Sequence, residues 1–148
     1  MDKVTVRIKK LNAGAILPSY GSEYAAGMDL YALTDGEVSI APGQTVLIHT
    51  GVATEIPDGY AGLVYARSGL ASKKGLAPAN KVGVIDADYR GEIMVAHHNH
   101  GALPQTIGNG ERIAQMVISP CVRAELEESD ELSDTVRGAG GFGSTGTN

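Results

Sequence analysis

Short segments of alternating apolar and polar residues, separated by turns, run through most of the chain. Val4, Val6 and Ile8 alternate with polar residues, which is the period of a half-buried β-strand. Residues 12–27 are loop-like. Further extended segments are predicted at residues 29–33, 45–49, 51–56, 63–66, 92–96 and 113–118.

Turn signals divide these segments at regular intervals. Pro42-Gly43, Pro57-Asp58-Gly59 and Asn109-Gly110 are strong turn or hairpin sequences. Short strands with turns roughly every 8–12 residues predict an all-β sandwich, jelly roll or barrel. Only residues 68–74 favour a helical turn, with Ser68 as the candidate N-cap.

Composition narrows the class of protein. The 148 residues suffice for one domain with a real core, and 12 basic against 17 acidic residues leave a net charge of −5. This balance argues against a general nucleic-acid or membrane-surface binder, so an anionic ligand must be held by a few placed cations or by a metal. A single cysteine excludes an internal disulfide, and no apolar leader or membrane-spanning run is present. We therefore expect a cytoplasmic protein.

The segment from Gly83 to Gly91, G-V-I-D-A-D-Y-R-G, concentrates candidate chemistry. Its apolar start, polar centre and flanking glycines predict a β-hairpin whose second strand is 92–96. Asp86 and Asp88 are two apart, so on an extended backbone their carboxylates face the same way and Tyr89 faces the other. An Asp-rich turn taken alone is more often only a turn, because Asp side chains bond their own backbone.

Two further segments carry groups that suit anions. Arg67, Ser68 and Gly69 follow a predicted strand, where the first N–H groups of a helical turn would point at an anion. The C-terminal segment R-G-A-G-G-F-G-S-T-G, residues 137–146, can form neither strand nor helix. It is either a disordered tail or a segment that binds an anion and a flat ring. Its G-x-G-x-x-G spacing does not indicate a dinucleotide site, because no strand–helix context surrounds it.

Five segments, in order, resemble the five motifs of the trimeric dUTPase family (deoxyuridine triphosphate nucleotidohydrolases). They are A-G-M-D-L from Ala26, A-R-S-G-L-A from Ala66, G-V-I-D-A-D-Y-R-G from Gly83, G-E-R-I-A-Q-M-V from Gly110 and the glycine-rich tail from Arg137. The resemblance covers nearly the whole chain. It implies a distorted β jelly roll, a homotrimer with active sites at subunit interfaces, and Mg²⁺-dependent hydrolysis of dUTP to dUMP and pyrophosphate. It also implies a domain over residues 1–136 and a flexible lid over residues 137–148.

The resemblance assigns roles to individual residues. Asp86 is expected to activate the water that attacks the α-phosphorus, and Tyr89 to pack on the deoxyribose and exclude a 2′-hydroxyl. Asp29 is expected to hold Mg²⁺ through water, since Mg²⁺ keeps several waters and takes other ligands from phosphates. The expected uracil readers are Asn80, Gly83, Val84, Ile85 and Met94. The expected phosphate and lid residues are Arg67, Ser68, Gly69, Gln115, Arg137, Phe142, Gly143 and Ser144.

Some features depart from the family pattern or leave alternatives open. Ala66 stands where the second motif more often has proline. His97, His98 and His100 are not a family hallmark, and we interpret them as solvated or interface histidines rather than as metal ligands. Two alternative functions are a dCTP deaminase of the same fold and a non-catalytic nucleotide-binding trimer. The complete tail and the retained carboxylate at position 86 favour the dUTP hydrolase.

Overall fold

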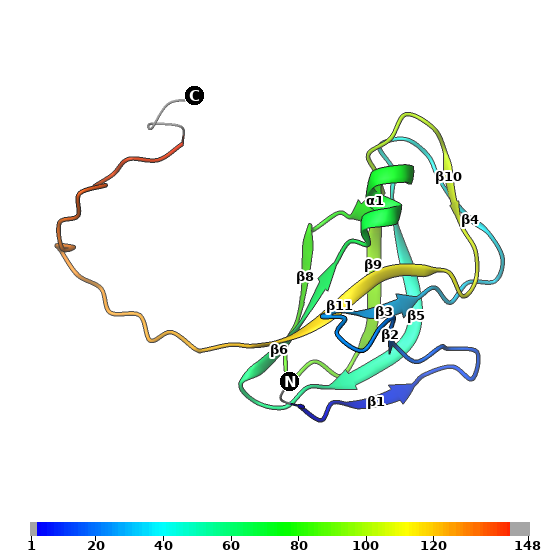
Figure 1. Cartoon of the computed structure of the whole chain (residues 1–148), viewed down its shortest axis with the longest axis horizontal. Coiled ribbons are helices and arrows are strands. Elements are labelled where there is room, and N and C mark those ends of the chain that lie inside the picture. Colours follow the sequence, from blue (N-terminus) through cyan, green and yellow to red (C-terminus); the bar gives the residue numbers. More distant parts are fainter. Residues whose placement is uncertain (1–2, 143–148) are drawn as a thin grey trace.

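The computed structural model describes residues 3–142, in which the chain forms eleven β-strands and one short helix (Figure 1). The strands are β1 (Arg7–Lys10), β2 (Ser19–Tyr20), β3 (Met28–Tyr31), β4 (Val38–Ile40), β5 (Thr45–Glu55), β6 (Tyr60–Tyr65), β7 (Leu76–Pro78), β8 (Val82–Ile85), β9 (Glu92–Asn99), β10 (Gln105–Ile107) and β11 (Arg112–Pro120). The helix is α1 (Ser68–Lys74). The all-β prediction is confirmed.

The strands form two larger antiparallel sheets and a two-stranded one. One sheet has the order β1-β5-β9-β7, the second β2-β3-β11-β6-β8, and the small sheet pairs β10 with β4. The core draws residues from both larger sheets, such as Leu30 and Met116 from the second and Ile48, Ile93 and Val95 from the first. This arrangement is the one expected for a jelly roll, in which the apolar faces of two sheets pack on each other.

Strand β5 is one long strand where the sequence predicted two. Its pairing register with β9 shifts between His49 and Ala53, so the strand bulges there instead of ending. Gly51 lies in the bulge with a φ of 70°. A Cβ atom at this position would lie 2.6 Å from Leu33 Cδ2 and 2.8 Å from Ala15 Cβ, so both conformation and space require glycine.

The predicted hairpin over residues 83–96 is wrong. Strand β8 pairs with β6, whereas β9 pairs with β5 and β7, so residues 86–91 connect two different sheets. The Asn109-Gly110 turn also connects two different sheets, because β10 pairs with β4 whereas β11 pairs with β3 and β6. A local turn signal marks where the chain reverses, but it does not specify which strand the next segment meets.

Helix α1 begins where the sequence predicted a helical turn, with one difference at its start. Arg67 occupies the N-cap position with an extended backbone and makes no side-chain cap hydrogen bond. Ser68 is therefore the first helical residue rather than the cap. The only buried residue of the helix is Leu70, which packs on the core.

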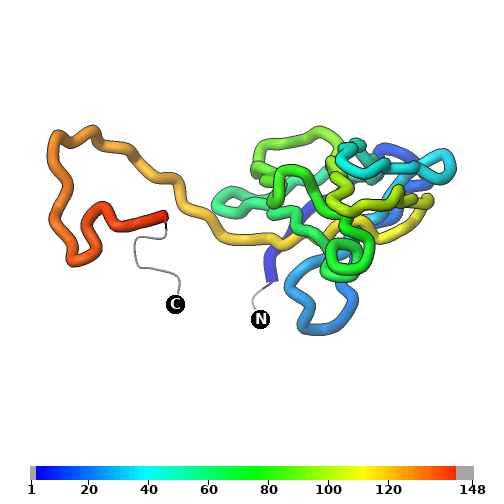
Figure 2. The backbone as a smooth tube through the Cα atoms, turned by 90° about the horizontal axis from the view of Figure 1, so that it is seen from above, coloured from blue at the N-terminus to red at the C-terminus, as the bar shows by residue number. Residues whose placement is uncertain are grey.

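The two ends of the described chain are exposed. Val4 and Ile8, predicted to be half-buried, are 38% and 37% exposed. Ile8 lies on β1, which is an edge strand, and Val4 precedes that strand. After β11 the chain leaves the body as an extended arm, seen from two directions in Figures 1 and 2. At the start of this arm, Cys121 is exposed and its N–H donates to the Gly59 carbonyl at 2.9 Å. Between residues 3 and 142 no helix is both long and apolar enough to cross a membrane.

Candidate functional site

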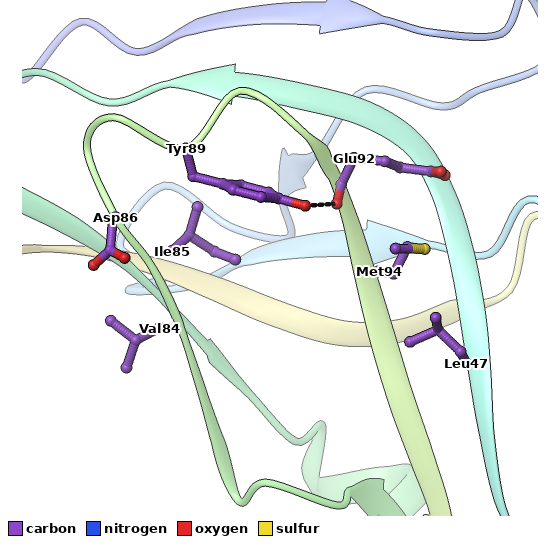
Figure 3. Close-up of a pocket in the computed structure, with 7 residues that line it drawn as sticks. All are labelled: Leu47, Val84, Ile85, Asp86, Tyr89, Glu92 and Met94. Carbon is purple, nitrogen blue, oxygen red and sulfur yellow. Dashed lines mark hydrogen bonds between the residues drawn. The ribbon is translucent and has the colours of Figure 1, made fainter.

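A pocket lies where the edge strand β8 faces β9 and β5 across the connection of residues 86–91 (Figure 3). Its lining residues are Leu47, Val84, Ile85, Asp86, Tyr89, Glu92 and Met94. We call it the loop pocket. Four of the predicted nucleoside-site residues in this set come from β8 and the connection, and Met94 comes from β9 on the opposite wall. A largely apolar wall with one exposed carboxylate suits a flat ring held beside a reactive group.

The connection turns tightly, which brings Asp86 and Tyr89 to the same pocket. The Tyr89 N–H donates to the Asp86 carbonyl at 3.1 Å, and the Arg90 guanidinium donates to the Ala87 carbonyl at 2.6 Å. Because this backbone is a turn and not extended, the predicted alternation does not hold. Asp86 and Tyr89 line the pocket, and Asp88 does not.

The Tyr89 ring packs on its own loop. Its hydroxyl donates to the Glu92 carbonyl at 2.9 Å, drawn as a dashed line in Figure 3. A Cβ atom added at Gly91 would lie 2.6 Å from Tyr89 Cζ, closer than side-chain atoms can approach. The hydroxyl end of the ring thus lies against Gly91, where a larger residue would clash with it.

Glu92 is a second carboxylate at this pocket, and its oxygens are already engaged. Oε1 accepts the Gly51 N–H at 2.7 Å, and Oε2 accepts the His49 Nδ1–H at 2.9 Å. Burial raises the pKa of Glu92, but the hydrogen bonds from His49 and Gly51 outweigh it, so the pKa lies below its usual 4.5. Glu92 is therefore a fixed carboxylate rather than a proton carrier at neutral pH.

A second pocket lies at the start of helix α1, between that helix and β3. Its lining residues are Gly21, Ala25, Gly27, Asp29, Arg67, Ser68, Gly69, Arg112 and Gln115. We call it the arginine pocket. The sheet register explains its composition, because Gln115 on β11 lies directly between Asp29 on β3 and Tyr65 on β6. Directly opposed residues share a face, so segments 36 to 86 residues apart in sequence meet there.

Ion pairs fix the cations of the arginine pocket. Arg67 Nε donates to Asp29 Oδ1 at 2.8 Å, and Arg112 Nη1 donates to Asp29 Oδ2 at 3.3 Å. Gln115 Nε2 donates to the Ala66 carbonyl at 2.9 Å, next to Arg67. Arg67 Nη1 also donates to the Arg112 carbonyl at 3.4 Å. One carboxylate thus orients two guanidinium groups, which carry further N–H donors suited to an anion such as a phosphate.

The predicted residues are gathered only in part. Asn80 is exposed in the turn before β8, and Gly83 lies within β8; neither lines the loop pocket or the arginine pocket. Arg137 and Phe142 lie on the exposed arm, where Arg137 Nε donates to the Gly140 carbonyl at 2.8 Å. Gly143 and Ser144 lie outside the described residues. Within one chain, the described part of the tail motif, residues 137–142, therefore lines neither pocket.

Sequence reasoning did not single out six of the pocket-lining residues: Leu47 and Glu92 at the loop pocket, and Gly21, Ala25, Gly27 and Arg112 at the arginine pocket. Arg112 belongs to the quoted fourth motif but was not singled out, although an arginine three residues before Gln115 is a usable signal. Leu47 and Glu92 carried no such signal, because their place depends on the pairing of β5 with β9.

One of the three histidines differs from the prediction, whereas His98 is partly exposed and His100 is exposed. His97 is fully buried, not solvated, because it lies on the inward face of β9 with Ile93 and Val95. Its Nε2–H donates to the Ile113 carbonyl at 2.8 Å, while Nδ1 has no hydrogen-bond partner among residues 3–142. His98 and His100 stack edge-on with ring centroids 4.4 Å apart.

The donors present fit magnesium only through water. Both oxygens of Asp29 already face guanidinium groups, which disfavours direct coordination of a cation. Among residues 3–142, no group of three or more His, Cys, Asp or Glu side chains could hold a metal. Mg²⁺ carried on the phosphates of a ligand, with water between it and Asp29, agrees with this chemistry.

The sequence is similar to those of known proteins over nearly its full length. The sequence profile of the dUTPase family matches residues 13–146. The chain belongs to the dUTPase family. It is 50% identical to the deoxyuridine 5′-triphosphate nucleotidohydrolase of Syntrophotalea carbinolica over 146 residues, which is 99% of each chain. The enzyme of the same name from Desulfitobacterium hafniense is 52% identical over 145 residues, 97% of this chain and 96% of that one.

Solved structures of the dUTPase family share the fold. The dUTPase of Staphylococcus bacteriophage 80alpha, solved with dUPNHPP, superposes with a TM-score of 0.89 at 31% identity. The match covers 98% of this chain and 100% of that chain. The family predicted from the five motifs is thereby confirmed.

Proposed function

We propose that this protein hydrolyses dUTP to dUMP and pyrophosphate, which lowers dUTP and supplies dUMP for thymidylate synthesis. The observation that carries the proposal is the loop pocket, where Asp86 and Tyr89 lie together beside the edge strand β8. Family membership supports the same reaction, because the relatives carry the name of this activity.

Main-chain groups of strand β8 and its neighbours recognise uracil. Strand β8 is the last strand of its sheet, so its outer edge carries backbone N–H and C=O groups without a strand partner. The backbone of Val84 and Ile85, with Met94 opposite and Asn80 at the strand's start, can form a base-pairing edge for uracil. Cytosine reverses those donors and acceptors and would leave buried groups unpaired.

The sugar and the triphosphate meet different groups. The ring of Tyr89, whose hydroxyl end lies against Gly91, leaves no room for a 2′-hydroxyl, so ribonucleotides are excluded by steric clash. The arginine pocket takes the phosphates with Arg67, the amides of Ser68 and Gly69, and Gln115. Asp29 keeps Arg67 oriented for this contact through their 2.8 Å ion pair.

Asp86 is the base that performs the reaction. Its exposed carboxylate holds a water by hydrogen bond and accepts the water's proton as the oxygen attacks the α-phosphorus. Mg²⁺ bound to the phosphates supplies neutralisation of their charge. Arg137, Phe142, Gly143 and Ser144 then close over the nucleotide as a lid that excludes other water.

The two pockets share no residue, which supports a site assembled from more than one subunit. We therefore place the complete sites at the subunit interfaces of a homotrimer, where the loop pocket of one subunit meets the arginine pocket of another. This arrangement gives the nucleoside and the triphosphate separate binding surfaces.

The first test measures pyrophosphate release from dUTP, UTP, dTTP and dCTP with Mg²⁺, together with ammonia release from dCTP. We expect pyrophosphate from dUTP and no ammonia.

Asp86→Asn should lower kcat at least about a hundredfold while dUTP still binds, since only the general base is lost. Asp88→Asn is the matched control, because Asp88 lies in the same connection but outside the pocket. Ammonia from dCTP would favour the deaminase, and full activity of Asp86→Asn would contradict the assigned base.

A further inference from the structure

We infer that Glu92 is a positioning residue that sets the discrimination between deoxyribose and ribose by holding the main chain to which Tyr89 is anchored. The inference rests on the proposed function. Glu92 itself need not touch the nucleotide; it acts through Tyr89, whose hydroxyl donates to the Glu92 carbonyl at 2.9 Å.

The first support is a gap in the sheet beside Glu92. Between His49↔Met94 and Ala53↔Glu92 the pairing of β5 with β9 is irregular, because β5 bulges at Gly51. Regular ladder hydrogen bonds are interrupted in such a bulge. The main chain at the beginning of β9 is therefore not held by pairing alone.

Side chains replace the missing ladder bonds. The Gly51 N–H, turned out of the ladder by the positive φ, donates to Glu92 Oε1 at 2.7 Å. His49 Nδ1 closes the other side of the carboxylate at 2.9 Å, and Thr50 Oγ1 donates to the Ile93 carbonyl at 2.5 Å. The Glu92 carboxylate thus fastens β9 to the bulge at the residue that anchors Tyr89. Figure 3 shows its side chain directed toward β5, with the Tyr89 hydroxyl at its main chain.

The second support is the way Tyr89 is held. The hydroxyl end of the ring lies so close to Gly91 that a Cβ atom there would clash with it, and its only hydrogen-bond anchor within residues 3–142 is the Glu92 carbonyl. Exclusion of a 2′-hydroxyl by clash requires a ring that cannot retreat. If the main chain of residues 91–92 shifts, the ring shifts with it and the clash is relieved.

The chemistry of Glu92 also argues against a role as a second base. Both carboxylate oxygens are engaged by donors, and those hydrogen bonds keep the group ionised. A carboxylate held in this way is suited to fixing geometry.

The experiment compares kcat/KM for dUTP and UTP in the full-length protein. Glu92→Ala should reduce the dUTP/UTP ratio about tenfold or more, because a displacement near 1 Å is costly for positioning. Glu92→Gln should restore most of the ratio, since its amide oxygen still accepts the Gly51 N–H. His49→Ala removes one of the two hydrogen-bond partners of the Glu92 carboxylate and leaves no cavity in the core, because the His49 side chain is largely exposed. Its dUTP/UTP ratio should lie between those of the wild type and Glu92→Ala.

A double-mutant cycle separates positioning from general destabilisation. Tyr89→Phe removes the anchored hydroxyl, so Tyr89→Phe and Glu92→Ala should not be additive in the dUTP/UTP ratio. Glu55→Ala is the matched control, because Glu55 lies on the same strand as the bulge and, within the described part of the chain, forms an ion pair only with the exposed Arg7. Its ratio should equal that of the wild type.

Three outcomes would overturn the inference: an unchanged ratio in Glu92→Ala, an unchanged ratio in His49→Ala should Glu92→Ala not fold, or full additivity in the cycle. A wild-type protein that does not hydrolyse dUTP would instead contradict the proposed function. The two failures are therefore distinguishable.

Discussion

At the scale of single residues, His97 is a titratable group placed where it cannot easily be charged. Burial lowers its pKa below the usual 6.5, and the hydrogen bond to the Ile113 carbonyl offsets only part of this. The carbonyl can only accept, so Nε2 carries the proton, and Nδ1, which has no hydrogen-bond partner in the described part of the chain, is a bare lone pair in the core. Protonation of Nδ1 would bury an uncompensated charge.

This placement predicts a pH dependence of stability. Below pH 6.5 the unfolded chain takes up a proton at His97 before the folded chain does, so protonation favours unfolding. As the pH is lowered from 6.5 to the pKa of His97 in the folded protein, the free energy of unfolding should fall by about 1.4 kcal/mol for each pH unit. Urea denaturation at a series of pH values between roughly 5 and 8, the range in which His titrates, measures this pH dependence at a constant protein concentration.

His97→Gln should flatten this dependence, because glutamine can still donate to the Ile113 carbonyl and does not titrate. His98→Gln is the control, since His98 lies on the opposite, partly exposed face of β9. The effect is separate from Glu92, whose lowered pKa adds stability that is lost only below pH 4.5. An equal slope in His97→Gln and in the wild type would contradict the assignment.

At the scale of elements, the C-terminal arm contributes little to the body of the fold. Residues 121–139 are exposed, and Val122, Leu126, Leu132 and Val136 are each about nine-tenths exposed or more. The arm carries Arg137 and Phe142, whose predicted place is over the nucleotide and not in the core. We therefore expect the arm to contribute to catalytic turnover and not to the stability of the fold.

Removal of residues 137–148 should leave the melting temperature nearly unchanged and lower kcat sharply, because the site then stays open to water. Thermal melts and steady-state assays with dUTP measure the two effects. Phe142→Ala in the full chain is the control that removes the ring alone. A large loss of thermal stability on truncation would mean that the segment is a structural strap.

At the scale of the whole molecule, one chain carries two pockets with complementary chemistry. The loop pocket offers an apolar wall and a base, and the arginine pocket offers cations and amides. Neither is a complete site for a nucleoside triphosphate. The proposed trimer joins them, and subunit mixing can test that.

Asp86→Asn and Arg67→Ala should each be nearly inactive alone. If the two residues of one site come from different subunits, about a quarter of the sites in trimers refolded from an equal mixture should carry both Asp86 and Arg67. Recovery of dUTP hydrolysis after refolding measures this. No recovery above the two separately refolded variants would place both residues of a site in one chain.

Much of the site could be predicted because its chemistry is local. The segment around Asp86 and Tyr89, and the one around Arg67, Ser68 and Gly69, each place their groups within a few residues of one another. The roles of these residues stay predictions, and Asn80, Arg137 and Phe142 also lie outside both pockets. Glu92 could not be found in this way, because its partner His49 is 43 residues distant.

The sequence by itself determined the strand-forming pattern, the turns and the identity of the reactive side chains, because these depend on residues close in the chain. Only the tertiary structure decided which strands pair, and it joined β8 and β9 to different sheets instead of to each other. It also decided that His97 is buried, that Glu92 fastens a bulge, and that Asp29 lies between two arginines. Such contacts depend on the register between strands distant in sequence, and a one-residue shift would turn every side chain to the other face.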